Sequence, residues 1–266
     1  MNTKIVILML LIIGLLSGCN QITQKKDQKD LKTDNSIIGE WLRIGQSGSF
    51  GFDFKNNGLV EGDFGNDKSI DVVAGYELTG DTIKFVDKEG QMCPGYGLYK
   101  IYLTDYYLAF DLIEDSCEGR IKTIMGYWTR PNFKDFLTIL DNEISDSPNP
   151  KAFLNRARIY IALGKSKQAK EDLDSFILND TTNARVYINR AGTRLPNDLE
   201  GVIFDCNKAI ALEPNNKNAY FLRGLARYDL GEQELGCVDF NKAIELGFSV
   251  LKIAEQEKCA EFWDEK

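Results

Sequence analysis

The spacing of hydrophobic and polar residues divides this chain of 266 residues into segments with three different patterns. Residues 5–13 are continuously apolar, residues 37–130 alternate with a period of two, and beyond about residue 150 the period is that of a helix. Alternation is typical of half-buried strands, whereas a period near 3.6 indicates amphipathic helices. The chain is therefore predicted to be an α+β multidomain protein, with a β domain over 36–130 and an all-α domain over 131–266.

Short alternating runs with turn residues between them predict the strands of the β domain. In one run, Phe50, Phe52 and Phe54 alternate with small or acidic residues, and Asn57-Gly58 then marks a turn. The predicted strands are 38–44, 49–54, 59–64, 70–78, 82–87, 97–103, 106–112 and 120–129. Eight antiparallel strands with this spacing are typical of a small up-and-down barrel or a closed sandwich.

Both ends of the β domain carry distinctive residues. Gly39-Glu40-Trp41 stands at its start, and Arg130 follows Tyr127-Trp128-Thr129 at its end. These positions resemble the Gly-x-Trp and the final arginine of the lipocalin-like family, which implies that Arg130 packs over the Trp41 ring. The domain is shorter than typical lipocalins, so its many aromatic side chains are expected to fill the interior. A small cavity for an apolar ligand is the alternative.

Two sets of residues recur in the helical part at intervals of 33 or 34 residues. The first set is Asn155-Arg156-Ala157, Asn189-Arg190-Ala191 and Leu222-Arg223-Gly224. The second set is Asp172, Asp205 and Asp239. A period near 34 with two marks in each unit indicates stacked helix–turn–helix units.

These marks, together with Gly164 and Gly231 between the two helices of a unit, resemble tetratricopeptide repeats. The resemblance implies an all-α solenoid of three repeats, at 150–181, 183–215 and 217–248. Helices predicted at 133–144 and 250–263 would cap its two ends, because a solenoid needs polar caps to cover its core.

The apolar run at the N-terminus has the pattern of a secretory signal. Lys4 precedes it, and Leu16-Ser17-Gly18-Cys19 follows it. The last four residues resemble the processing site of bacterial lipoproteins, which implies a signal peptide over 1–18, lipidation of Cys19 and a membrane-anchored, envelope location. Asn20 favours the outer membrane by the same resemblance, and the membrane face stays open. Residues 19–35 are polar and mixed in charge, as expected of a flexible tether.

Composition excludes several functional classes. The chain has 40 acidic and 32 basic residues, a net charge of −8, and no stripe of basic residues of the kind that nucleic acids require. It contains no histidine, so Ser-His-Asp and Cys-His catalysis and the usual zinc sites are excluded. We therefore expect a protein that is not an enzyme, with no cofactor, no metal and no nucleic-acid partner.

Export permits disulfides among the five cysteines that follow Cys19. Cys93 and Cys117 are equidistant from a predicted strand turn at Asp105, and Cys237 and Cys259 are equidistant from a helix turn at Phe248. These symmetries predict two bridges and leave Cys206 as a free, buried thiol. A Cys206–Cys237 bridge is the main alternative.

The repeat resemblance implies that proteins or peptides bind on the concave face formed by the first helix, helix A, of each unit. The residues that map to this face are Lys151, Leu154, Asn155, Arg158, Arg185, Ile188, Asn189, Asn218, Phe221, Leu225 and Tyr228. Leu154 and Phe221 could instead pack between helices. The leading hypothesis is a non-enzymatic, lipid-anchored envelope adaptor, and the alternative is a carrier that holds a small apolar ligand in the barrel.

Overall fold

The structure is a computed structural model, and it describes residues 36–45, 48–65, 67–87, 93, 95–248 and 259. The predicted signal peptide, Cys19, the tether and most of the predicted helix at 250–263 lie outside the described residues. Those assignments stay predictions.

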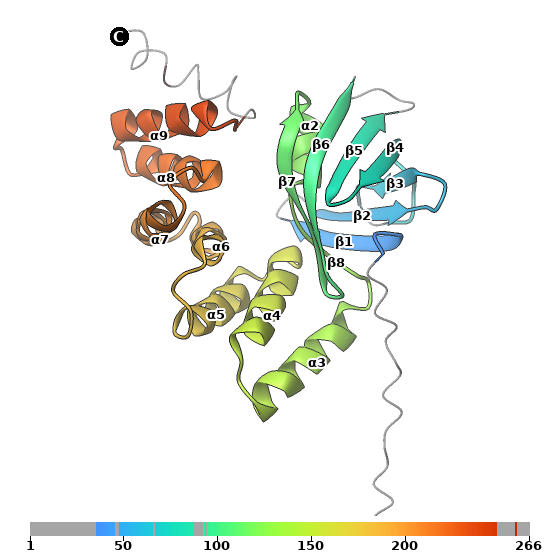
Figure 1. Ribbon diagram of the computed structural model, residues 1–266, viewed down its shortest axis with the longest axis horizontal. Coiled ribbons are helices and arrows are strands. Elements are labelled where there is room, and N and C mark those ends of the chain that lie inside the picture. Colours follow the sequence, from blue (N-terminus) through green and yellow to red (C-terminus); the bar gives the residue numbers. More distant parts are fainter. Residues whose placement is uncertain are drawn as a thin grey trace, which may run out of the picture. The chain divides into compact units, whose positions relative to one another are not determined.

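An antiparallel β-barrel forms the first part of the described chain (Figure 1). Consecutive strands pair with each other, and the last strand pairs back with the first at Leu42 and Thr129. The strands are β1 (Gly39–Gly45), β2 (Gly48–Phe54), β3 (Leu59–Asp63), β4 (Val72–Thr79), β5 (Thr82–Asp87), β6 (Tyr96–Leu103), β7 (Tyr107–Asp115) and β8 (Gly126–Thr129). The predicted eight-stranded barrel is therefore present.

The predicted strand at 120–129 is wrong over its first half. Helix α2 (Glu118–Ile124) precedes β8, which contains only four residues. Ile121 and Ile124 are three positions apart and both buried, a spacing that puts them on one side of a helix. The Cys117 side chain accepts from the Arg120 N–H and caps the helix. The sequence did not predict this helix, because the segment is short and the residues around it alternate as in a strand.

Aromatic rings fill the interior of the barrel. Phe52 stacks on Trp128 with ring centroids 4.4 Å apart, and Phe85 contacts Tyr99 at 5.8 Å and Phe110 at 6.0 Å. Trp128, Tyr99 and Phe85 are almost fully buried. Packing of this kind excludes water and contributes about 0.5–1.5 kcal/mol per ring pair beyond area burial. The barrel interior is thus a packed core.

Arg130 ties the beginning of the barrel to its end. Its guanidinium lies 3.8 Å from the centroid of the Trp41 ring, as the Gly-x-Trp pattern predicts. The same group donates to the main-chain oxygens of Ile38 at 2.9 Å and Ser36 at 2.6 Å. Arg130 therefore satisfies the backbone that leads into β1 while covering one face of the indole.

A buried ionic cluster closes the barrel beside α2. Arg120 donates to both carboxylate oxygens of Asp115, at 2.6 and 2.7 Å, and the Tyr99 hydroxyl donates to the same carboxylate at 2.5 Å. Burial and then this hydrogen bond raise the pKa of Tyr99, which stays a neutral donor. A buried carboxylate requires such partners, because an unpaired charge away from water is costly.

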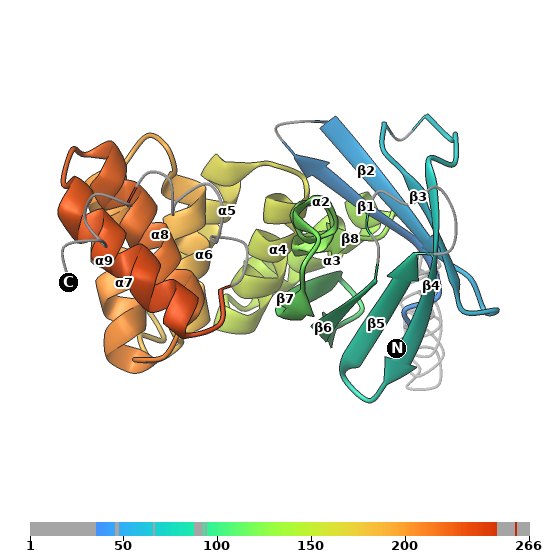
Figure 2. The same cartoon turned by 90° about the horizontal axis from the view of Figure 1, so that it is seen from above.

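Seven helices follow the barrel within the described residues, a single helix and then three antiparallel pairs (Figure 1, Figure 2). They are α3 (Phe133–Asp146), α4 (Pro150–Ala162), α5 (Ser166–Ile177), α6 (Ala184–Arg194), α7 (Leu199–Leu212), α8 (Lys217–Asp229) and α9 (Gln233–Glu245). Gly164 and Gly231 end α4 and α8 with φ of +66° and +86°, a conformation that glycine adopts without strain. The pairs α4/α5, α6/α7 and α8/α9 form the three units.

One arginine in each unit joins three helices, and we call this series the arginine ladder. Each arginine makes a bidentate pair with an aspartate of the second helix of its own unit, with N–O distances between 2.6 and 3.0 Å. These pairs are Arg156–Asp172, Arg190–Asp205 and Arg223–Asp239. The remaining terminal nitrogen of each arginine donates to a side chain of the preceding helix, at 2.6 or 2.7 Å. The acceptors there are Asp141, Asp174 and Asn207.

The acceptors on the preceding helices are evenly spaced along the chain, and this spacing shows how α3 belongs to the repeats. Asp141 lies 33 residues before Asp174, which lies 33 before Asn207, so α3 occupies the place of the second helix of a preceding unit. Helix α3 therefore contributes a ladder contact in addition to covering the first unit.

Removing one ladder carboxylate should destabilise the repeats strongly. Asp205 is fully buried, so Asp205→Asn removes the buried charge of its pair with Arg190, leaves that arginine only Asp174 as a charged partner, and is expected to cost about 3 kcal/mol of unfolding free energy. Urea unfolding followed by circular dichroism measures the loss. The matched control is Asn207→Asp, which gives Arg223 the aspartate acceptor that the other two ladder arginines have. Because position 207 is exposed, the change should be neutral or stabilising by up to about 1 kcal/mol. An unchanged midpoint for Asp205→Asn would contradict this role.

The structure pairs Cys93 with Cys117 and Cys237 with Cys259, with Cα–Cα distances of 5.5 and 5.6 Å. The symmetry argument for the first bridge needs correction. A bulge at Leu98/Tyr99 shifts the β6–β7 register, and Cys93 and Cys117 lie beyond the two strands. The bridge therefore joins the segment before β6 to the start of α2.

Cys206 is buried and free, and burial raises the pKa of its thiol to about 12. It should therefore be inert to thiol reagents in the folded protein, because the thiolate is the reactive form. In the chain with Cys19→Ser, we expect no titratable thiol when native, one when denatured without reductant, and five after reduction. Peptide mapping that detects a Cys206–Cys237 bridge would overturn the assignment.

Candidate functional site

Side chains from the A helices, α4, α6 and α8, of all three units contact strand β7. Repeat one contributes Arg158, which donates to the Tyr107 hydroxyl with its guanidinium 4.6 Å from that ring's centroid. Repeat two contributes Arg185, which forms an ion pair with Asp111. Repeat three contributes Lys217, whose ammonium donates to the main-chain oxygen of Leu112 at 2.8 Å. The strand thus crosses the three units in the order of the chain.

Strand β8 adds a second line of contact. The Tyr127 hydroxyl lies 2.9 Å from Nδ2 of Asn189 on α6, and its ring packs against Tyr107 at a centroid distance of 5.6 Å. Tyr107, Ala109 and Tyr127 form an apolar cluster with Ala162 at the end of α4. The barrel wall is therefore held on the first repeat by apolar packing and on the second by hydrogen bonds.

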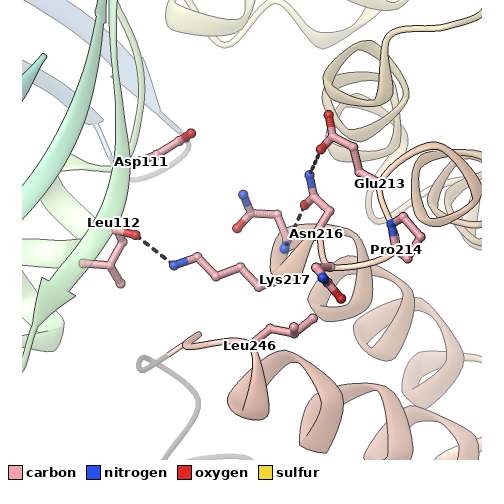
Figure 3. A pocket seen from close by; sticks show the side chains of 9 residues that line it. Asp111, Leu112, Glu213, Pro214, Asn216, Lys217 and Leu246 are labelled. Carbon is pink, nitrogen blue, oxygen red and sulfur yellow. Dashed lines mark hydrogen bonds between the residues drawn. The ribbon is translucent and has the colours of Figure 1, made fainter.

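Two hollows separate the barrel wall from the second and third repeats. Figure 3 shows the larger, of about 560 Å³, with Asp111 and Leu112 on the barrel side and Glu213, Asn216 and Lys217 on the helical side. The Lys217 side chain spans the gap to Leu112. A second hollow of about 360 Å³ lies nearer α6 and is lined by Tyr102, Asp111, Tyr127, Arg185, Asn189 and Asn218, among others. We call these two hollows together the interdomain cleft.

The electrostatics of the cleft are mixed in sign. Burial disfavours the charge on Arg185, but interactions with Tyr127 and Asp111 outweigh burial and raise its pKa. Burial lowers the pKa of Lys217, which donates to main-chain carbonyls of Leu112 and Gly247. Amide groups of asparagine lie between these charges. The cleft therefore suits a polar chain that offers both donors and acceptors.

The predicted concave-face residues are divided among three surroundings. Arg158, Arg185, Ile188, Asn189 and Asn218 face the barrel wall or the cleft. Leu154 is buried in the core between the first two units, and Asn155 is buried as well, whereas Lys151 is exposed.

In the third unit, Phe221, Leu225 and Tyr228 pack against the cluster around the Cys237–Cys259 bridge. Phe221 stacks on Phe248 with ring centroids 4.5 Å apart. Packing between helices is thus the observed environment of both Leu154 and Phe221. The assignment of these residues to partner binding stays a prediction.

Sequence reasoning missed the barrel's share of this site. Tyr107, Asp111 and Tyr127 belong to strands that were expected to be solvent-exposed on one face. One signal was present, since Tyr107, Leu108, Ala109 and Phe110 form an apolar run without alternation, and all four are buried. Such a run is typical of a strand covered on both faces.

No group of acidic and cysteine side chains within the described ranges is arranged to hold a metal ion. Among the helices that the structure describes, none combines the length and the apolar character needed to cross a membrane.

The comparison with known proteins points to the helical part. The family model of the tetratricopeptide repeat matches residues 150–183. Human mitochondrial import receptor subunit TOM70 is 26% identical over 140 residues, which are 50% of this chain and 23% of that protein. The small glutamine-rich tetratricopeptide repeat-containing protein of Dictyostelium discoideum is 34% identical over 134 residues, 50% of this chain and 37% of that protein. The chain thus spans between about a quarter and two fifths of these relatives.

Solved structures give matches of the same kind. A crystal structure of MamA aligns with a TM-score of 0.47 and 21% identity, covering 57% of this chain and 90% of that one. The second repeat region of Spaghetti (RPAP3), bound to an HSP90 peptide, aligns with a TM-score of 0.36 and 27% identity, covering 41% and 98%. Together, the family match and the helix pairs show that this chain contains tetratricopeptide-type repeats.

The Tyr127–Asn189 contact should couple barrel and repeats measurably. Tyr127→Phe removes a half-buried hydrogen bond and is expected to cost about 1 kcal/mol, with a similar coupling energy in a double-mutant cycle with Asn189→Ala. Chemical denaturation measures both. Tyr96→Phe is the control, because its hydroxyl contacts Glu114 at an exposed site and its loss should stay within about 0.5 kcal/mol. A coupling energy of zero would show that the contact carries no stability.

Proposed function

We propose that this protein is a non-enzymatic adaptor of the bacterial envelope, held at a membrane by lipid on Cys19 and engaging another protein through its repeats. The match over residues 150–183 supports the repeat assignment, and stacked helical repeats provide an extended surface suited to protein chains. The outer membrane is the favoured location, because Asn20 follows the lipidation site.

The anchor and the tether supply position. A processed lipoprotein cysteine carries more than one acyl chain, which is enough for stable membrane attachment. Residues 19–35 would then give the folded part freedom to reach partners close to the membrane surface.

The barrel serves as a platform for the repeats. Its packed aromatic interior offers no support for the alternative, a carrier of a small apolar ligand, which would need an enclosed apolar cavity. Its outer wall instead completes the interdomain cleft, and its lipocalin-like character would lie in the Gly-x-Trp and arginine arrangement.

The interdomain cleft is the proposed recognition site, and its composite lining is the observation that carries the proposal. Asn218, Lys217 and Arg185 from the repeats face Asp111 and Leu112 from the barrel across the gap. One relative is named as a mitochondrial import receptor subunit, which supports a protein as the class of ligand.

Site-specific photo-crosslinking in cells tests this proposal. A photoreactive amino acid at Asn218, in the cleft, should capture a discrete partner, whereas the same residue at exposed Lys167 on α5 should not. Cys19→Ala should abolish capture at Asn218 by releasing the protein from the membrane. Equal capture at positions 218 and 167 would argue against a specific cleft, and capture that survives Cys19→Ala would remove the anchor from the function.

A further inference from the structure

The three repeats hold the barrel wall with unequal firmness. Helix α4 comes close to the backbones of β1, β7 and β8, and Gly164 at its end leaves no room for a side chain, since a Cβ there would lie 2.9 Å from the Ile44 oxygen. Apolar packing of Ala162 with Tyr107 and Tyr127 supports this contact. The first repeat is therefore the fixed end of the interface.

The second and third repeats reach the barrel through side chains, among them Asn189, which hydrogen-bonds to Tyr127, and Arg185, which also lies 4.0 Å from the centroid of the Tyr102 ring. Arg185 extends to Asp111 and lines the hollow of about 360 Å³. Lys217 extends to the Leu112 oxygen and lines the hollow of about 560 Å³. The Arg185 and Asp111 side chains keep 28% and 33% of their surface exposed. Water screens a pair in this setting, so its formation contributes little free energy.

We infer that strand β7 is a built-in occupant of the repeat groove, and that the Arg185–Asp111 pair is a latch that an acidic side chain of the partner opens by replacing Asp111. The inference rests on the proposed function and names its regulation. Asp111 presents to Arg185 the carboxylate that a partner would present. Exchange of one partly exposed carboxylate for another changes the free energy little, so additional partner contacts in the cleft decide which carboxylate stays.

Lys217 makes the opening selective for acidic chains. Its ammonium donates to neutral main-chain oxygens of Leu112 and Gly247, so its charge lies on the barrel side of the larger hollow, one residue along the strand from Asp111. A partner carrying two carboxylates could pair with Arg185 and Lys217 at once. A basic segment would offer no carboxylate to replace Asp111 at Arg185.

Lysine footprinting of the full chain tests the latch without any partner. Asp111→Asn breaks the pair while leaving Arg185 in place, and opening separates Lys217 from Leu112. Because the Asp111 charge also raises the pKa of Lys217, its loss alone speeds acylation, so the rise supports the latch only if Arg185→Gln, which keeps Asp111, shows it too. Acylation of Lys217 by N-hydroxysuccinimidyl acetate should then rise about fivefold, the factor that corresponds to about 1 kcal/mol for a partly exposed pair. Lys167 serves as the internal reference.

Asp81→Asn is the matched control, because it removes the same charge from an exposed barrel pair with Lys100. It should leave Lys217 acylation unchanged. An unchanged Lys217 rate in Asp111→Asn, or an equal rise in Asp81→Asn, would overturn the latch whatever the partner experiments show.

Two variants separate the latch from the proposed function. Both Asp111→Asn and Arg185→Gln should increase Lys217 acylation, but only the first keeps the cation that the partner needs. Capture from Asn218 should therefore rise in Asp111→Asn and fall in Arg185→Gln. Faster acylation with unchanged capture in both variants would show that the cleft opens without controlling a partner. That result would refute the inference, whereas capture that is absent from wild type and both variants would refute the proposed function itself.

Discussion

The bidentate pairing of a buried aspartate with an arginine, repeated once in every helical unit, is the constraint on which the arrangement of the helices depends. Each aspartate is buried, and a buried carboxylate needs a charged partner. Its arginine supplies this partner through two nitrogens, Nε and one terminal nitrogen. The same arginine then has one terminal nitrogen to spare, and the preceding helix supplies the acceptor. Stacking, spacing and the position of α3 all follow from satisfying this one group in each unit.

The arginine ladder also explains how the barrel and the helices are joined. Its first acceptor, Asp141, sits on α3, which starts three residues after Arg130. Arg130 covers Trp41 and binds the backbone that leads into β1. One short stretch of chain therefore connects the packed end of the barrel to the first acceptor of the arginine ladder, and neither part has a long flexible link to the other.

Periodicity predicted the elements better than it predicted their contacts. The barrel, the repeats and both cysteine pairs were predicted from the sequence, because alternation and a 34-residue period are strong signals, although the turn symmetry behind the Cys93–Cys117 pair did not hold. Helix α2 was missed, because Ile121 and Ile124 share one buried side within only seven residues. The pairing of Asp111 with Arg185 could not be predicted, because 74 residues separate them and only the packed fold brings them together. The arginine ladder was recoverable, since its arginines and aspartates recur with the same period.

Strand β7 has to satisfy two neighbours at once. Leu108 and Phe110 point into the barrel core, while Tyr107, Ala109 and Asp111 meet the helices, and β6 and β8 pair with its backbone on both sides. A strand held this way cannot peel off as a loose peptide would, so any movement of the groove's occupant has to carry the barrel with it as a rigid body. A substitution along β7 therefore has to be compatible with both the barrel and the helices, and we expect β7 to be the slowest-evolving strand of the sheet.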